Sequence, residues 1–175
     1  MDNSTGTALF RELANDGEEL GDTNFCTVIA TAVVFGKTFE QANKLLIKHA
    51  NRRKRRGLQR HKSLSAWSYL AKQENYDYRV YTAREIKEKF TNGKTLTTGN
   101  SSKYLNPKKR YIISVSRHVA GVVDNMVHDW TNGKTNRAQQ LIEFTPRETV
   151  ELIPETSDVS GYNEWNNRLA KMLTA

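Results

Sequence analysis

The sequence has 175 residues, of which 37 % are hydrophobic, enough for one domain with a proper core. Its single cysteine excludes an internal disulfide and a cysteine-rich zinc site, and it indicates a reducing compartment. No apolar run approaches the roughly 20 residues that cross a bilayer, and the acidic amino terminus is unlike a signal peptide. We therefore expect a cytoplasmic protein that needs no metal, no cofactor and no membrane.

The net charge of +8 comes from one segment, residues 48–62, which holds eight basic residues and no acidic one. Removing these eight from the 27 basic residues leaves 19, which matches the 19 acidic residues, so the rest of the chain is neutral. Such a run predicts a partner that is nucleic acid or an acidic protein, although a solvated helix end is the simpler alternative. No base-reading motif accompanies the run. The candidate binding residues are Arg52, Arg53, Lys54, Arg55, Arg56, Arg60 and Lys62.

The first 35 residues predict an N-terminal extension followed by a central helix. Residues 1–20 are polar with weak helical periodicity, and we assign the single domain to residues 21–175. The run 25–35 is apolar on all sides and stops at a glycine, which favours a buried helix over a buried strand. Thr23 or Asn24 offers N-cap chemistry for this helix, and either cap places Cys26 in its first turn.

Three further helices and a strand are expected before residue 104. A capping box at Thr38 opens a helix with apolar residues at helical spacing. Residues 63–74 form another helix with one apolar face, residues 76–81 alternate as a strand, and a second capping box at Thr82 opens a short helix. The polar stretch 91–103 is typical of a loop.

The second half of the chain changes character and predicts mostly strands, rich in β-branched residues. Helices first and an antiparallel sheet after them define an α+β fold. The expected strands are 110–117, 118–123, 126–130, 141–144 and 148–153, and a last helix is expected over 162–173.

One predicted hairpin has a register that can be worked out. A two-residue turn after Val123 pairs that residue with Met126. Because side chains alternate between faces, His118 and Asp129 then lie on the same face as diagonal neighbours. His128 points to the other face, where we expect a structural role.

The same-face pair is what a base and its orienter require. A neutral imidazole can take a proton from a thiol if its other nitrogen donates to a group that fixes the tautomer. Cys26, at the start of a helix, has the setting that favours thiolate. The sequence thus predicts Cys26 as nucleophile, His118 as base and Asp129 as orienter. Taken singly, the thiol fits a buried apolar residue and the histidine a surface one.

Two stretches resemble the papain-like cysteine peptidase superfamily, in particular small papain-like proteins encoded by bacteriophages. They are Gly-Asp-Thr-Asn-Phe-Cys-Thr-Val-Ile-Ala at 21–30 and the block 111–130, which runs from Tyr-Ile-Ile-Ser through His-Val-Ala-Gly to His-Asp-Trp. The resemblance implies a papain-like core in which N-terminal helices, the central one starting at Cys26, pack on a C-terminal antiparallel sheet. It also implies amide hydrolysis or acyl transfer, in the host cytoplasm for a phage-encoded protein.

The chain departs from the papain-like pattern at the oxyanion hole. These peptidases usually carry a glutamine about six residues before the cysteine, where this sequence has Leu20. Asn24 is our candidate for an alternative amide donor.

Three hypotheses follow. The first is a thiol hydrolase, that is, a peptidase, isopeptidase or related amidase or acyltransferase acting on a peptide or protein. The alternative is a catalytically degenerate papain-like binding module that engages nucleic acid or an acidic host protein through residues 48–62. A structural virion component is the third hypothesis, which no repeat or coiled-coil pattern supports.

Overall fold

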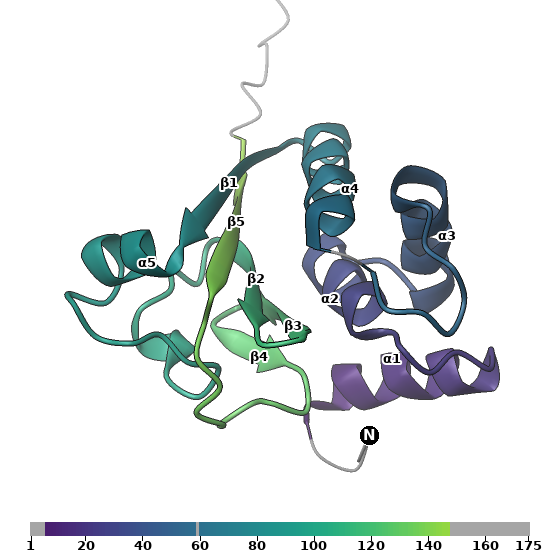
Figure 1. The fold of residues 1–175 in the computed structure, drawn as a ribbon, viewed down its shortest axis with the longest axis horizontal. Helices are drawn as coiled ribbons and strands as arrows, with labels where there is room; N and C mark the ends of the chain where they lie inside the picture. The colour runs from purple at the N-terminus through teal and green to yellow at the C-terminus, as the bar shows by residue number, and fades with distance from the viewer. Residues whose placement is uncertain (1–5, 59, 148–175) are drawn as a thin grey trace, which may run out of the picture.

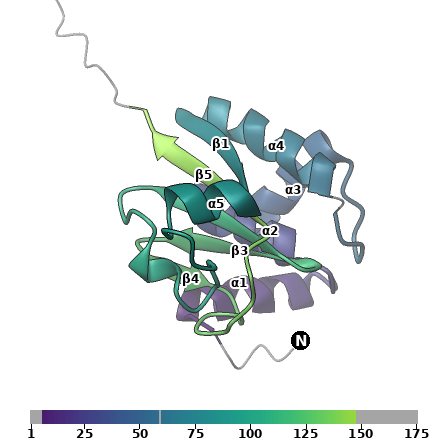
Figure 2. The same cartoon turned by 60° about the vertical axis from the view of Figure 1, so that its left-hand side comes forward.

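The computed structural model describes residues 6–58 and 60–147. Over these residues the chain forms five α-helices and one five-stranded antiparallel sheet, which confirms the predicted α+β class. Figures 1 and 2 show α1 to α4 packed against one face of the sheet and α5 with the neighbouring loops on the other. The helices are α1 (Ala8–Glu19), α2 (Cys26–Phe35), α3 (Phe39–Ala50), α4 (Arg60–Gln73) and α5 (Ala83–Lys89), with a 3-10 turn η1 (Ser101–Lys103). The strands are β1 (Tyr76–Thr82), β2 (Arg110–Val115), β3 (His118–Val123), β4 (Met126–His128) and β5 (Gln140–Pro146).

Local chemistry accounts for the ends of several helices. Both predicted capping boxes are present, with Thr38 and Gln41 opening α3 and Thr82 and Glu85 opening α5. Helix α2 ends at Gly36, whose φ of 60° is the left-handed conformation that a glycine adopts at low cost.

The predicted cap of α2 is wrong. The N-cap residue is Phe25, which makes no side-chain hydrogen bond to the helix, so neither Thr23 nor Asn24 caps it. Instead, the Asp22 Oδ1 atom accepts hydrogen bonds from the backbone N–H groups of Thr23 and Asn24, at 2.8 and 3.4 Å. Cys26 is thus the first helical residue.

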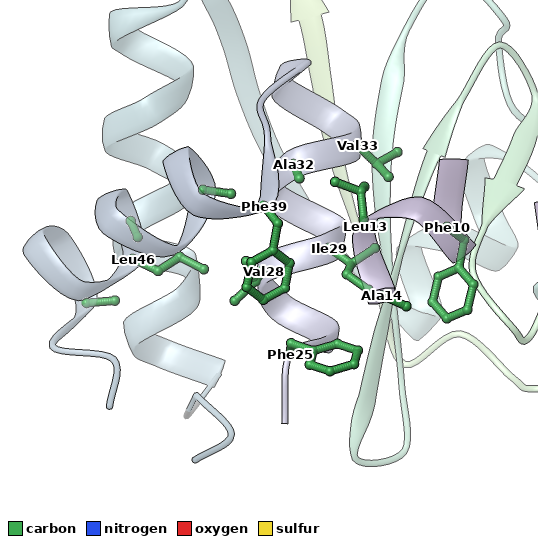
Figure 3. Packing of buried hydrophobic residues seen from close by; sticks show 13 residues of the cluster. Phe10, Leu13, Ala14, Phe25, Val28, Ile29, Ala32, Val33, Phe39 and Leu46 are labelled. Carbon is green, nitrogen blue, oxygen red and sulfur yellow. The ribbon is translucent and has the colours of Figure 1, made fainter. Parts of the chain in front are cut away.

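Helix α2 is the centre of the fold because it is apolar all round and is covered on every side. Figure 3 shows one part of this core, in which α2 lies between α1 and α3. Helix α1 therefore supplies core residues, although residues 1–20 were assigned to an extension. The buried side chains in this cluster include Phe10, Leu13, Phe25, Val28, Ile29, Phe39 and Leu46. No helix in the described residues is both long and apolar enough to cross a membrane.

The strand order is β1-β5-β2-β3-β4, and the β3–β4 hairpin has the predicted register, with Val123 opposite Met126. Asp124 and Asn125 both have positive φ values, 50° and 62°, as a two-residue hairpin turn requires. The pairing of β4 ends at His128, two residues earlier than predicted. The expected strand 148–153 and helix 162–173 lie outside the described residues.

Gly121 of β3 allows α2 to lie very close to the sheet. A Cβ atom at this position would be 2.8 Å from Val33 Cγ1 and 3.2 Å from the Ala30 carbonyl oxygen, both in α2. The missing side chain therefore sets the distance between the helix that carries Cys26 and the strand that carries His118.

We expect Gly121→Ala to lower the free energy of unfolding by about 1–3 kcal/mol, because the added methyl group overpacks this contact. Urea denaturation measures the change. Gly57→Ala is the matched control, since a Cβ there meets no atom within 4 Å. Equal stability of the Gly121 variant and the wild type would show that α2 can move away from the sheet without cost.

Candidate active site

The β3–β4 hairpin brings His118 and Asp129 together. The His118 Nε2–H donates to Asp129 Oδ2 over 2.8 Å. The same oxygen accepts from the backbone N–H and the hydroxyl of Thr131, at 3.0 and 2.6 Å. Asp129 is 2 % exposed, so its carboxylate is held in one orientation by three donors, and it holds the imidazole in turn.

Cys26 lies on the other side of the imidazole. The His118 side chain and the backbone N–H of Val119, the next residue of β3, act on the thiol electrostatically, and all three residues line one cavity. Since Nε2 is committed to Asp129, the ring nitrogen left for Cys26 is Nδ1. The half-buried thiol is therefore in reach of solvent and of a base at once.

The charges of this pair follow from its contacts. Burial by itself would raise the pKa of the Cys26 thiol, but the hydrogen bond to His118 and its positive charge outweigh burial and hold that pKa below its ordinary value. Burial also disfavours a charged His118, yet the hydrogen bonds to Asp129 and Cys26 raise the pKa of His118 to about 9. Both shifts favour the ion pair of thiolate and imidazolium over the neutral pair.

A cavity of about 180 Å³ opens beside the thiol. Its walls come from α2, α4, the β2–β3 turn and the start of β5. Gln140 in this wall has a buried side-chain oxygen without a hydrogen-bond partner in the described structure, which leaves an acceptor for a bound N–H group. Arg117, at the mouth, is exposed and adopts a positive φ of 55° in the turn before His118.

The structure places Asn24 differently from the prediction. Its side-chain Nδ2 donates to the Arg55 carbonyl over 2.9 Å, and Asn24 is not among the described residues that line the cavity. The donors that remain beside the thiol are the backbone N–H groups of the first turn of α2, which have no partner within the helix.

His128 lies on the opposite face of the hairpin from His118, as the register requires. Its Nδ1 atom is hydrogen-bonded over 3.0 Å to the hydroxyl of Thr7, the N-cap residue of α1. Burial lowers the pKa of His128. It joins β4 to the first helix and does not contact the thiol.

The basic segment does not form one exposed surface. Arg52 is 3 % exposed and makes an ion pair with Asp22 over 2.7 Å, so its assignment to a binding surface is wrong. The sequence of the basic segment does not reveal that Arg52 pairs with Asp22, thirty residues earlier in the chain. Arg55 donates through Nε to the Gly21 carbonyl. The exposed cations of the run are Lys48, Arg53, Lys54, Arg55 and Arg56. Lys62 is half-buried, and the side chain of Arg60 lies outside the described part of the structure.

Gln140 and Arg117 were not predicted as site residues. The signal for Arg117 was available, since it directly precedes the candidate base. Gln140 reaches the site only because β5 inserts between β1 and β2, a pairing that the sequence pattern does not reveal. Among the described residues no group of three or more histidine, cysteine or acidic side chains could hold a metal ion.

Comparisons with known proteins give no further guide. No family model, no curated protein and no solved structure matches this chain. The chemistry of the site is therefore considered from its own geometry and charges.

Proposed function

We propose that this chain is a thiol hydrolase with a papain-like core, acting on a peptide, isopeptide or related amide bond. The observation that carries the proposal is that Cys26 and His118 line one cavity and interact electrostatically, while the His118 ring is hydrogen-bonded to the buried carboxylate of Asp129. A helix that starts at the nucleophile and a strand that starts at the base are also the papain-like order. In this proposal the chain is a phage-encoded protein of that kind, working in the host cytoplasm.

Each residue has one task in the reaction. The Cys26 thiolate attacks the carbonyl carbon, and the resulting oxyanion is stabilised by N–H groups at the start of α2. The His118 imidazolium gives its proton to the leaving amine as the C–N bond breaks, which leaves a thioester on Cys26. His118 then takes a proton from water as that water attacks the thioester, which breaks the C–S bond, releases the acid and restores the thiolate beside the imidazolium. Asp129 keeps the ring oriented throughout.

The second candidate is a binding module with the same fold and no turnover. The position of Asn24 favours it, because the amide expected to complete the oxyanion hole bonds to Arg55 instead. Under this alternative the thiol still has a low pKa but no acyl group is turned over.

The pH dependence of two reactions tests the proposal. Alkylation of Cys26 by iodoacetamide should rise with an inflection below the ordinary thiol pKa of about 8.5. Hydrolysis of a peptide anilide should rise over the same range and then fall as the pH passes about 9, where His118 loses the proton it gives to the leaving group. The charged pair of Cys26 and His118 also stabilises the folded state. The part of this stabilisation that comes from the protonated His118 is lost as the pH rises through about 9.

p-Nitrophenyl acetate separates the two candidates, because it acylates a reactive thiol whatever the peptide specificity. A hydrolase should release p-nitrophenolate repeatedly, whereas a binding module should stop after one acetyl group per Cys26, which mass spectrometry would detect. An alkylation profile with the inflection of free cysteine, or a thiol that is labelled only after unfolding, would show that Cys26 is a core residue.

A further inference from the structure

Leu58 separates two hollows of the surface. On one side it lines the cavity beside Cys26, and on the other it lines a groove of about 680 Å³. Leu58 itself is half-buried and packs against the core cluster around α2. A chain bound with one residue at the thiol would therefore continue over Leu58 into this groove, which we call the basic groove.

The basic groove is lined by Ile47, Asn51, Arg52, Arg53, Arg56, Gly57, Leu58 and Lys62. No carboxylate is among the described residues that line it, and none lines the cavity beside Cys26. Arg117 adds a cation to the lining of that cavity. Apart from Arg52, which is paired with Asp22, the cations that line the two hollows have no carboxylate beside them in the described walls, which favours an anionic ligand.

The basic groove is held at a fixed position relative to the thiol. Asp22, four residues before Cys26, forms the ion pair with Arg52 and accepts a hydrogen bond from the Arg55 backbone N–H over 3.0 Å. Arg52 also donates to the Asn24 carbonyl over 3.1 Å. The loop that carries the cations is therefore bonded to the loop that leads into α2, so the two hollows form one surface.

We propose, on the basis of the thiol hydrolase function above, that the substrate is an acidic polypeptide whose carboxylates lie in the basic groove while its scissile bond lies at Cys26. A polypeptide fits better than a nucleic acid for two reasons. With Arg52 neutralised by Asp22, only Arg53, Arg56 and Lys62 remain to pair with anions among the described residues that line the groove. None of these described lining residues is aromatic and able to stack on a base, whereas the exposed Ile47 and the half-buried Leu58 offer apolar contacts to a peptide.

Fluorescence anisotropy tests the binding. The probes are a fluorescein-labelled octapeptide of alternating Glu and Ala, its Gln counterpart, and an eight-residue oligo-dT. The wild type should bind the Glu peptide at least about tenfold more tightly than the other two, and added salt should weaken that binding. Tighter binding of the oligo-dT, or equal binding of the Glu and Gln peptides, would overturn the proposal.

Charge-matched variants locate the binding site. Arg53→Gln with Arg56→Gln should weaken binding of the Glu peptide about tenfold. Lys87→Gln with Lys94→Gln removes the same charge from exposed lysines in and after α5, on the other side of the sheet (Figure 1), and should change it less than twofold. Equal losses in both pairs would mean that the peptide responds to net charge alone, and would also overturn the proposal.

Protection of Cys26 from iodoacetamide tests the continuity of the two hollows. The Glu peptide should slow alkylation of the wild type severalfold and should not slow that of the Arg53/Arg56 variant. Binding without protection would separate the groove from the thiol and refute the inference, while the pH profile of alkylation without peptide would still test the hydrolase function. An ordinary pH profile with charge-dependent protection would refute the hydrolase function and leave an acidic-peptide site beside Cys26.

Discussion

His118→Ala is expected to lower turnover of p-nitrophenyl acetate at pH 7 by at least about a thousandfold, with correct folding retained. The variant loses the proton acceptor for deacylation and the cation that lowers the pKa of Cys26. Its iodoacetamide profile should shift to that of an ordinary thiol. Circular dichroism and the rate of p-nitrophenolate release measure the two parts of this result.

Variants of the other two site residues, and a control variant at His128, complete that experiment. Cys26→Ala should abolish turnover, and the double variant with His118→Ala should lose little more, because the residues act as one unit. Asp129→Asn should be milder, since an amide oxygen can still orient the ring. His128→Gln, on the opposite face of the same hairpin, should leave turnover within about twofold. If His128→Gln and His118→Ala reduced turnover equally, the effect would be structural and the assigned base would be wrong.

Loss of the buried Asp22–Arg52 ion pair is expected to cost the most stability. Arg52→Leu should lower the free energy of unfolding by about 3–5 kcal/mol, because it leaves a buried carboxylate without its counter-charge. Both side chains are essentially inaccessible, at 1 % and 0 % exposure. Arg53→Leu, the exposed neighbour, should cost less than about 0.5 kcal/mol. Urea denaturation of the two variants measures the difference, and equal values would contradict the structural role of Arg52.

The Asp22–Arg52 ion pair should also make the stability of the fold depend on pH. Burial alone would raise the pKa of Asp22, but Arg52 and the backbone N–H groups around it hold that pKa below its ordinary value. The stabilisation is therefore fully present above the unfolded pKa of about 3.9 and is lost as the pH falls below it. Asp22→Asn should remove this part of the acid dependence.

Features set by neighbouring residues were predictable from the sequence. The capping boxes of α3 and α5 depend on four consecutive residues. The hairpin that pairs His118 with Asp129 depends on the length of one turn, and its register followed from the alternation of side chains. That is why two of the three candidate catalytic residues could be placed relative to one another before any coordinates were known.

Features set by contacts across the fold were not predictable. The start of α2 has no side-chain cap, and the loop before it is held by Asp22, which contacts Arg52 and Arg55 from a loop thirty residues later. The same contact removes Arg52 from the surface, and nothing in a run of similar cations shows which member will be buried. Gln140 enters the site through the insertion of β5 beside β2, which depends on the sheet order.

In the proposed hydrolase, the close packing of α2 on β3 also has a consequence for the folding of the active site. Cys26 belongs to the first quarter of the chain, whereas His118 starts β3 and Asp129 directly follows β4, about a hundred residues later. Joining them closes a long loop, which is slow and costs chain entropy that only the finished sheet offsets. During synthesis on the ribosome, a chain that has not yet paired β3 with β4 carries an ordinary cysteine. In the proposed hydrolase, the nucleophile and its base therefore come together only when the sheet is complete.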